Sequence, residues 1–336
     1  MIDTTSCSNG SLAAGERLAG SAPHAVAWMA LEQSGPWGPK ALTDSHLDKE
    51  LGRAIEGSAA AHRTRPSLIR RPGRHADKDA PTATDPRRLL VAHTHPANTW
   101  LLEGTIDEPD HVLRLDWAAL ERGDIEAVRR TLPQLVPSRL PHLLVCTNGT
   151  RDVCCATKGR PVALGVAGQI PDQVWEVTHT SGHRFAPTSV LLPAGTLHGR
   201  LNVAAAADVL HAAARDETVL EGSRGRSTWP SPAQVAELAV REETKELSLT
   251  ALEVAAHEST GEHAWLTEVD HVDGRSWHVE TVARESDVQW AESCGKALKP
   301  LTYFAVALTQ TRWDPPRSVL VRPQRRGTGH PLACNP

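Results

Sequence analysis

Short apolar runs separated by turn-forming residues organise the first third of the chain. Runs at 25–33, 66–73, 87–95 and 98–107 predict strands, because each is bounded by Pro, Gly, Asn or Asp. A helix is predicted after the first run, with Asp44 or Ser45 as N-cap, and a second helix follows Asp116. The predicted order is strand, helix, three strands, helix.

The same order recurs from about Pro141. Strands are predicted at 142–146, 173–179, 189–195 and 197–202, with a short helix within 158–168 and a final helix capped by Asn202. We interpret the recurrence as a degenerate repeat of one βαβββα-like unit, an arrangement typical of a thioredoxin-like layer. The fold class expected is therefore α/β, with two thioredoxin-like units.

A joint rich in Gly, Ser and Arg at 221–232 introduces a third segment. Pro232 is well placed in the first turn of a helix, and Asp273-Gly274 predicts a hairpin between two alternating runs. Residues 301–313 predict a further strand. We expect a small C-terminal α+β segment, followed by a flexible tail at 314–336.

Charge and length narrow the class of partner. The 336 residues carry a formal net charge of -4 with both signs interspersed, which argues against a nucleic acid or an anionic membrane as partner. No run of eighteen apolar residues and no secretory signal occurs, so a cytoplasmic location is expected. The abundance of Ala, Arg and Gly is typical of a high-GC bacterial genome.

Three of the six cysteines lie in one stretch, "HLLVCTNGTRDVCCATKG" at 142–159. In a reducing compartment, clustered cysteines indicate metal binding or redox catalysis more often than crosslinks. Cys146 and Cys155 are separated by eight residues, and His179 and His183 by three. Thiolate and imidazole together favour zinc, copper or an iron-sulfur cluster.

The spacing favours a ligand larger than one ion. Structural zinc sites usually use a tight cysteine pair, whereas an eight-residue gap makes a wide loop. A 2Fe-2S cluster has two irons that each need two ligands, which a cysteine pair and a histidine pair could supply. Thr180, Ser181 and Gly182 predict a turn between the histidines, so both imidazoles can converge.

Several motifs are similar to the sucrase/ferredoxin-like family, whose ferredoxin portion is related to thioredoxin-like 2Fe-2S ferredoxins. The matching stretches are "HLLVCTNGTRDVCCA", "VWEVTHTSGHRFAPTSVLLPAG" and "HGRLN", with weaker matches on both sides up to about residue 280. The resemblance implies a 2Fe-2S cluster with Cys146, Cys155, His179 and His183 as ligands. Sucrase activity is not expected, because no arranged carboxylate pair is found.

The function expected is electron transfer or redox sensing. A ferredoxin-like electron carrier is favoured over an enzyme. Its expected partner is an unidentified redox protein with which it exchanges electrons. A zinc-binding structural module using the same four residues is the alternative. The units predicted are an N-terminal thioredoxin-like unit without a cluster (1–135), a thioredoxin-like 2Fe-2S ferredoxin unit (136–220), the α+β segment (221–313) and the tail (314–336).

Other cysteines and histidines leave further alternatives. Cys154 could ligate in place of Cys155, although the eight-residue gap favours Cys155. A thiol-dependent oxidoreductase that uses Cys154 and Cys155 is the least favoured alternative, because adjacent cysteines form only strained disulfides. His93 and His95 are expected to serve the core or the surface. No metal role is expected for the isolated cysteines, which are Cys7, Cys294 and Cys334.

Overall fold

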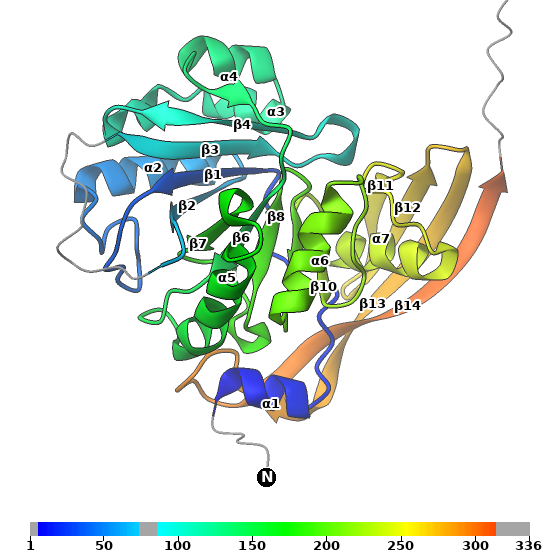
Figure 1. The fold of residues 1–336 in the computed structure, drawn as a ribbon. Helices are drawn as coiled ribbons and strands as arrows, with labels where there is room; N and C mark the ends of the chain where they lie inside the picture. The colour runs from blue at the N-terminus through cyan, green and yellow to red at the C-terminus, as the bar shows by residue number, and fades with distance from the viewer. Residues whose placement is uncertain (1–5, 74–85, 314–336) are drawn as a thin grey trace, which may run out of the picture.

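A computed structural model describes residues 6–73 and 86–313, and the predicted tail at 314–336 lies outside the described residues. Ten strands form one mixed sheet in the order β10-β9-β8-β6-β7-β2-β1-β3-β4-β5 (Figure 1). These strands are β1 (Ala27–Glu32), β2 (Thr64–Arg70), β3 (Arg87–His93), β4 (Trp100–Ile106), β5 (Val136–Pro137), β6 (His142–Cys146), β7 (Val174–Val177), β8 (Ser189–Leu192), β9 (Thr196–His198) and β10 (Ser223–Arg226).

The two halves of this sheet repeat one topology. In the first half the order is β2-β1-β3-β4, and in the second it is β7-β6-β8-β9. The β1/β2 and β6/β7 pairs are parallel, whereas the remaining pairs within each half are antiparallel. An antiparallel pairing between β2 and β7 joins the halves. The recurrence of strands predicted from the sequence is thus a recurrence of strand order.

Seven α-helices, four 3-10 helices and one π-helix are described. The α-helices are α1 (Cys7–Ala13), α2 (Lys49–Ala61), α3 (Trp117–Arg122), α4 (Ile125–Thr131), α5 (Arg160–Ala167), α6 (Val203–Ala213) and α7 (Ser231–Thr244). The others are η2 (Pro96–Asn98), η3 (Pro109–Arg114), the π-helix η4 (Cys155–Gly159), η5 (Pro171–Gln173) and η6 (His183–Phe185).

Side-chain caps explain where several helices begin. The predicted caps Asp116 and Asn202 are confirmed, because their side chains accept hydrogen bonds from backbone amides in the first turns of α3 and α6. The predicted cap of α2 was wrong. Asp48 caps this helix, while the Asp44 carboxylate accepts a hydrogen bond from the Lys40 amide at 3.1 Å within a preceding turn.

Strand alternation divides the apolar side chains between two sides of the sheet. In β1, Met29 and Leu31 belong to a core with α2, whereas Trp28 faces a second core. In β6, Val145 packs with residues of α5 and α6, whereas Cys146 shares the core of Trp28. We call the core that contains Trp28 and Cys146 the inner core. It draws residues from both halves of the sheet.

The C-terminal segment consists of α7 packed on a second sheet of order β11-β12-β13-β14. Its strands are β11 (Leu252–Gly261), β12 (Ala264–His271), β13 (Arg275–Trp290) and β14 (Lys299–Trp313). The predicted hairpin at Asp273-Gly274 is confirmed as the β12/β13 connection. Figure 1 shows β13 and β14 reaching from α7 down to α1.

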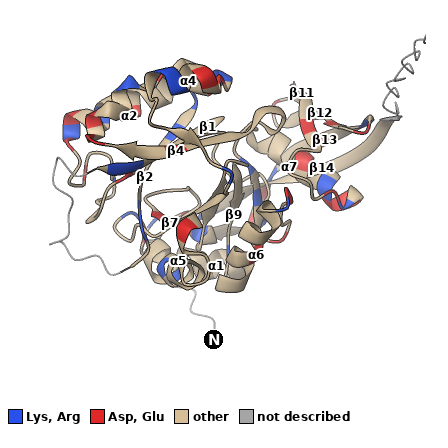
Figure 2. Ribbon diagram, turned by 45° about the horizontal axis from the view of Figure 1, so that its top comes forward, with Lys and Arg blue, Asp and Glu red and all other residues tan. Residues whose placement is uncertain are grey.

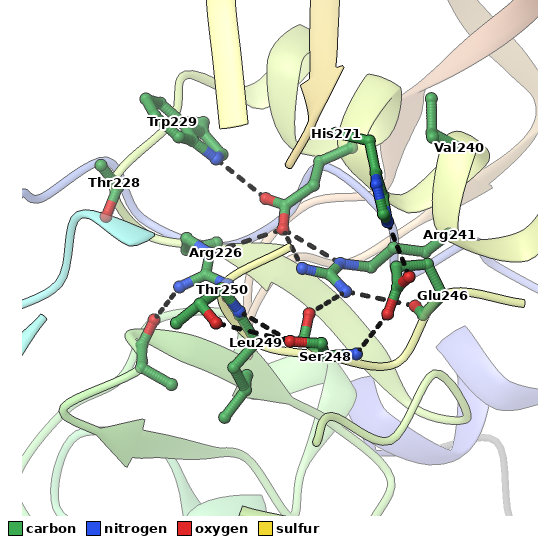
Figure 3. A network of polar contacts seen from close by, with 12 residues as sticks. Arg226, Thr228, Trp229, Val240, Arg241, Glu246, Ser248, Leu249, Thr250 and His271 are labelled. Atoms are coloured by element: carbon green, nitrogen blue, oxygen red, sulfur yellow. Dashed lines mark hydrogen bonds and ion pairs between the residues drawn. The ribbon is translucent and has the colours of Figure 1, made fainter. Parts of the chain in front are cut away.

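A buried ionic network ties α7 to the ten-stranded sheet (Figure 3). The Glu237 carboxylate accepts hydrogen bonds from Trp229 Nε1 at 2.8 Å and from Arg241 Nε at 3.0 Å. Arg226 Nε lies 3.5 Å from the same carboxylate, and its other nitrogens donate to the carbonyls of Ala194 and Leu249. Although burial opposes ionisation, these two guanidinium groups hold the pKa of Glu237 below its usual value.

The outer helices carry mixed charge. Figure 2 shows Lys and Arg interspersed with Asp and Glu over α2, α4 and α7. This distribution agrees with the interspersed charges in the sequence. Among the described residues, no helix is both long enough and apolar enough to cross a membrane.

Candidate functional site

The two cysteines eight residues apart come together in the inner core. Cys146 is the last residue of β6, and Cys155 begins the π-helix that follows; both are at most 1 % exposed. Gly159 allows this approach, because a Cβ there would lie 2.1 Å from the Cys146 carbonyl oxygen. The wide loop predicted between the cysteines therefore closes back on itself.

The two histidines lie on a tight turn after β7, as the sequence predicts. Ser181 and Gly182 both adopt left-handed backbone conformations, with φ of 62° and 70°. The turn brings the rings of His179 and His183 to a centroid distance of 4.9 Å at an interplanar angle of 26°. The two imidazole rings are therefore stacked face to face.

The Arg224 side chain stabilises this turn through hydrogen bonds. It is fully buried, and its guanidinium donates to the carbonyls of Thr180 and Ser181 at 3.3 and 3.0 Å. It also donates to the Ser21 carbonyl, which ties the turn to the chain before β1. Burial lowers the pKa of Arg224 to about 9, so the group stays cationic at neutral pH.

All four predicted ligands meet at this point. Cys155 Sγ lies 3.5 Å from His183 Nδ1. A hydrogen bond from the Cys155 thiol, opposed by burial and aided by His179, holds the pKa of Cys146 well below its usual range. The same hydrogen bond raises the pKa of Cys155. Burial lowers the pKa of both histidines, which keeps the imidazoles neutral and able to ligate.

Two observations test whether this group fits a metal cofactor. His179 Nδ1 is buried and has no hydrogen-bond partner among the described residues, a costly state that a metal bond would relieve. Some groups of described residues have ligand atoms that all lie within 4.8 Å of one another, as the ligands of a single ion would. The four predicted ligands do not form such a group, so their donor atoms are further apart. The donor set therefore fits a cofactor wider than one ion.

The residues around the predicted ligands have varied partners. Arg65 is partly buried, donates to the Ser181 hydroxyl at 2.9 Å and lies near Cys146. Arg184, beside the second histidine, forms an ion pair with Glu16 at 2.6 Å. Arg151 donates to the Pro39 carbonyl at the surface. The buried Arg224 and the partly buried Arg65 thus flank the four predicted ligands.

A second cysteine cluster lies directly beside the first. Cys7, Asp152, Cys154 and Cys294 each place one donor atom within 4.8 Å of the others, and this buried group could hold a metal ion. The three sulfurs form a triangle with sides of 3.4, 3.5 and 3.6 Å. Donation from Cys7 lowers the pKa of Cys154 to about 5 and raises the pKa of Cys7.

Sequence analysis missed this cluster. Cys7 and Cys294 were isolated in sequence and no metal role was expected for them, but the fold brings them to Cys154 across separations of 147 and 140 residues. One signal in the sequence was not used: Cys154 and Cys155 are adjacent, and the predicted ligand set needs only one of them. Cys334 lies outside the described residues.

His93 and His95, which were expected to serve the core or the surface, lie at the end of β3 and just before η2. His93 ends β3 and is buried, with Nδ1 3.1 Å from the Leu120 carbonyl oxygen. His95 precedes η2, and its side chain accepts a hydrogen bond from the Ala97 amide. Their rings stack at 6.4 Å. A core and capping role accounts for both.

Comparison with known proteins gives one result. No curated protein and no solved structure matches the chain. The family described as Sucrase/ferredoxin-like matches residues 18–225, which span both halves of the ten-stranded sheet and include the two cysteines and two histidines. The chain therefore belongs to the sucrase/ferredoxin-like family.

Proposed function

We propose that the protein is an electron-transfer or redox-sensing protein with a 2Fe-2S cluster held by Cys146, Cys155, His179 and His183. When bound, such a cluster takes up or releases one electron. The observation that carries the proposal is that His179 and Cys146 are in contact while Nδ1 of His179 is buried and has no hydrogen-bond partner among the described residues. Membership of the sucrase/ferredoxin-like family supports it, and we propose a thioredoxin-like fold for each half of the sheet.

The two ligand pairs have different exposure. Both cysteines are buried, so water is excluded from their sulfurs, whereas both histidines are only partly buried. Their rings are therefore the groups nearest to solvent and form the natural path for an electron. Neutral imidazoles in place of two thiolates also raise the reduction potential relative to an all-cysteine site.

A groove beside the histidines offers the approach for a redox partner protein. It has a volume of about 510 Å³ and is bordered by His179, His183 and Arg184 on one side. Lys296 in the β13/β14 connection and Lys299 at the start of β14 border it on the other. We propose that the partner contacts this groove through acidic side chains, because Arg184, Lys296 and Lys299 outnumber the one carboxylate of the groove, Glu292, which pairs with Lys299 at 2.9 Å.

The alternative, a zinc ion on the same four residues, is less well supported. A tetrahedral zinc site needs four donors around one centre, with sulfur atoms about 3.8 Å apart for a Zn–S bond of about 2.3 Å. The four donors do not converge in this way, whereas the neighbouring group does. The geometry thus favours different occupants for the two groups.

Metal and spectroscopic analysis of oxygen-protected protein tests the proposal. We expect about two irons and two acid-labile sulfides per chain, with visible absorption typical of an oxidised 2Fe-2S cluster. Double replacement of His179 and His183 by Ala should abolish the iron. Replacement of His93 and His95 by Ala is the matched control and should leave the iron content unchanged. Iron that survives loss of both ligand histidines would refute the proposed ligand set.

A further inference from the structure

The second cysteine cluster has the geometry of a single tetrahedral ion site. We propose that Cys7, Cys154, Cys294 and Asp152 bind one Zn²⁺ ion. For Zn–S bonds of about 2.3 Å, a tetrahedron places its sulfurs about 3.8 Å apart, close to the 3.4 to 3.6 Å observed here. These sulfur separations are much too long for a disulfide, whose S–S bond is about 2.05 Å.

The fourth corner of the tetrahedron belongs to Asp152. Its two carboxylate oxygens lie 3.8 and 3.7 Å from Cys7 Sγ. For bonds of about 2.3 Å to sulfur and 2.0 Å to oxygen, a tetrahedral edge between them is about 3.5 Å. Three thiolates with one carboxylate form a soft donor set with one harder oxygen, which suits zinc and not a hard cation such as Mg²⁺.

Hydrogen bonds already orient these ligands. The Asp152 carboxylate accepts from the backbone amides of Cys154 and Cys294, each at 2.9 Å, and from the Ser293 hydroxyl at 2.8 Å. The Cys7 amide lies 3.5 Å from Cys294 Sγ and donates to that sulfur. Such contacts to metal ligands fix their direction and typically cost 10- to 100-fold in metal affinity when removed.

The proposed ion joins three distant parts of the chain. Cys7 begins α1, Cys154 precedes the π-helix, and Cys294 lies in the β13/β14 connection. Trp290 adds a contact, because its indole donates to the Cys7 carbonyl and its ring lies where a Cβ on Gly10 would be. The connection that Cys294 anchors also borders the groove beside His183. Zinc would thus fix the loop that carries Cys155 and the wall of that groove.

Charge makes a bound cation necessary when the cysteines ionise. Three thiolates and a carboxylate would place four negative charges in a largely buried cluster, where like charges strongly disfavour one another. A divalent cation offsets this repulsion and displaces the thiol protons. The inference does not depend on the proposed 2Fe-2S cluster, because the two groups share no ligand.

Element analysis and native mass spectrometry of the full-length protein, after dialysis against EDTA, test the site. We expect about one zinc ion per chain. Cys7→Ser and Cys294→Ser should each lose most of that zinc and retain their iron, whereas Cys155→Ser should lose iron and retain zinc. Ser293→Ala, which removes a hydrogen bond to Asp152 but no ligand, is the control that should keep measurable zinc.

A second readout avoids the risk that a serine variant does not fold. Cys294→His supplies another zinc ligand and should restore zinc to at least half the level of the unaltered protein. In the unaltered protein, alkylation of Cys7, Cys154 and Cys294 should become at least tenfold faster when zinc is removed by a stronger chelator. The proposal is overturned if zinc is absent, if iron occupies these cysteines or if two of them form a disulfide. It is also overturned if the alkylation rate is the same before and after treatment with the chelator.

Discussion

Cys154 and Cys155 are neighbours in the chain, yet their sulfurs belong to different clusters. Cys154 Sγ lies 3.4 Å from Cys294 Sγ, whereas Cys155 Sγ lies 3.5 Å from His183 Nδ1. The difference arises where the chain enters the π-helix, since consecutive residues of a helix point in different directions around its axis. This division explains why one short segment contains two adjacent cysteines.

The adjacent cysteines should therefore respond differently to the same substitution. We expect the iron content of Cys155→Ser to fall at least tenfold, because the substitution removes a proposed ligand in the inner core. Cys154→Ser should keep its iron, because Cys154 packs against Cys7 and Ala186 outside the inner core. Iron and sulfide content of the two purified variants decides the matter. The reverse pattern would assign Cys154 as the ligand.

Replacing either proposed ligand histidine by cysteine should keep the cluster and lower its reduction potential. His183→Cys and His179→Cys should retain a cluster, because a thiolate still ligates iron. Their potentials should fall by on the order of 100 mV, because an added thiolate makes the cluster more negative. Redox titration followed by visible absorption measures the change. A potential equal to that of the unaltered protein would exclude ligation by that histidine.

Loss of the Arg224 guanidinium should loosen the histidine turn. Arg224→Met leaves the buried carbonyls of Thr180 and Ser181 without their donor, which should lower the free energy of unfolding by about 1–3 kcal/mol per unsatisfied group. Iron content should fall with it. Arg215→Met, at an exposed position, is the matched control. Urea denaturation that shows equal stability for both variants would contradict a bracing role.

The buried carboxylate of Glu237 should be essential for attaching α7 to the large sheet. Glu237→Gln removes the negative charge between Arg226 and Arg241 and should lower the free energy of unfolding by about 3–5 kcal/mol, because two buried cations lose their counter-ion. Glu242→Gln, on an exposed turn of the same helix, should change it by less than about 0.5 kcal/mol. Chemical denaturation monitored by circular dichroism compares the two.

Mild acid should destabilise the protein through buried histidines. Burial lowers the pKa of His198 to about 4, from an ordinary value near 6.5. Above pH 6.5 this histidine contributes no pH dependence, because it is neutral whether folded or unfolded. As the pH falls from 6.5 to 4, only the unfolded chain takes up the proton, so stability falls by about 3 kcal/mol in total. His142, whose pKa burial also lowers to about 4, acts in the same direction.

Unfolding free energies between pH 4 and 8 check this prediction. His198→Gln keeps a donor for the Val219 carbonyl. Below pH 6.5 the slope of its unfolding free energy against pH should be smaller, by the equivalent of about one bound proton. His211→Gln, at an exposed position of α6, should leave the pH profile unchanged. An acid limb that is the same in all three proteins would mean that His198 does not resist protonation in the folded state.

Local sequence signals predicted much of the sheet. Apolar runs located β1, β6 and β14, and Asp116 and Asn202 marked two helix starts, because strand alternation and capping depend on neighbouring residues. The start of α2 was misplaced because several Asp and Ser residues before it can all act as caps. Asp48 succeeded because Asp44 bonds within its own turn.

Long-range pairings were beyond the reach of the sequence. The join between β2 and β7, and the meeting of Cys7 with Cys294, depend on contacts between residues more than 100 positions apart. Spacing between residues in one segment singled out Cys146, Cys155, His179 and His183 as candidates, because each pair lies within one loop. The second cluster has its sulfurs on three separate segments, and no spacing pattern records that arrangement.

The central claim is that two cysteines and two histidines hold a 2Fe-2S cluster. Electron paramagnetic resonance of oxygen-protected protein, before and after reduction with dithionite, tests it most directly. We predict no signal in the oxidised protein and, after reduction, a signal of about one unpaired spin per two irons that shows coupling to histidine nitrogen. A colourless protein that contains zinc alone and gives no signal after reduction would contradict the account.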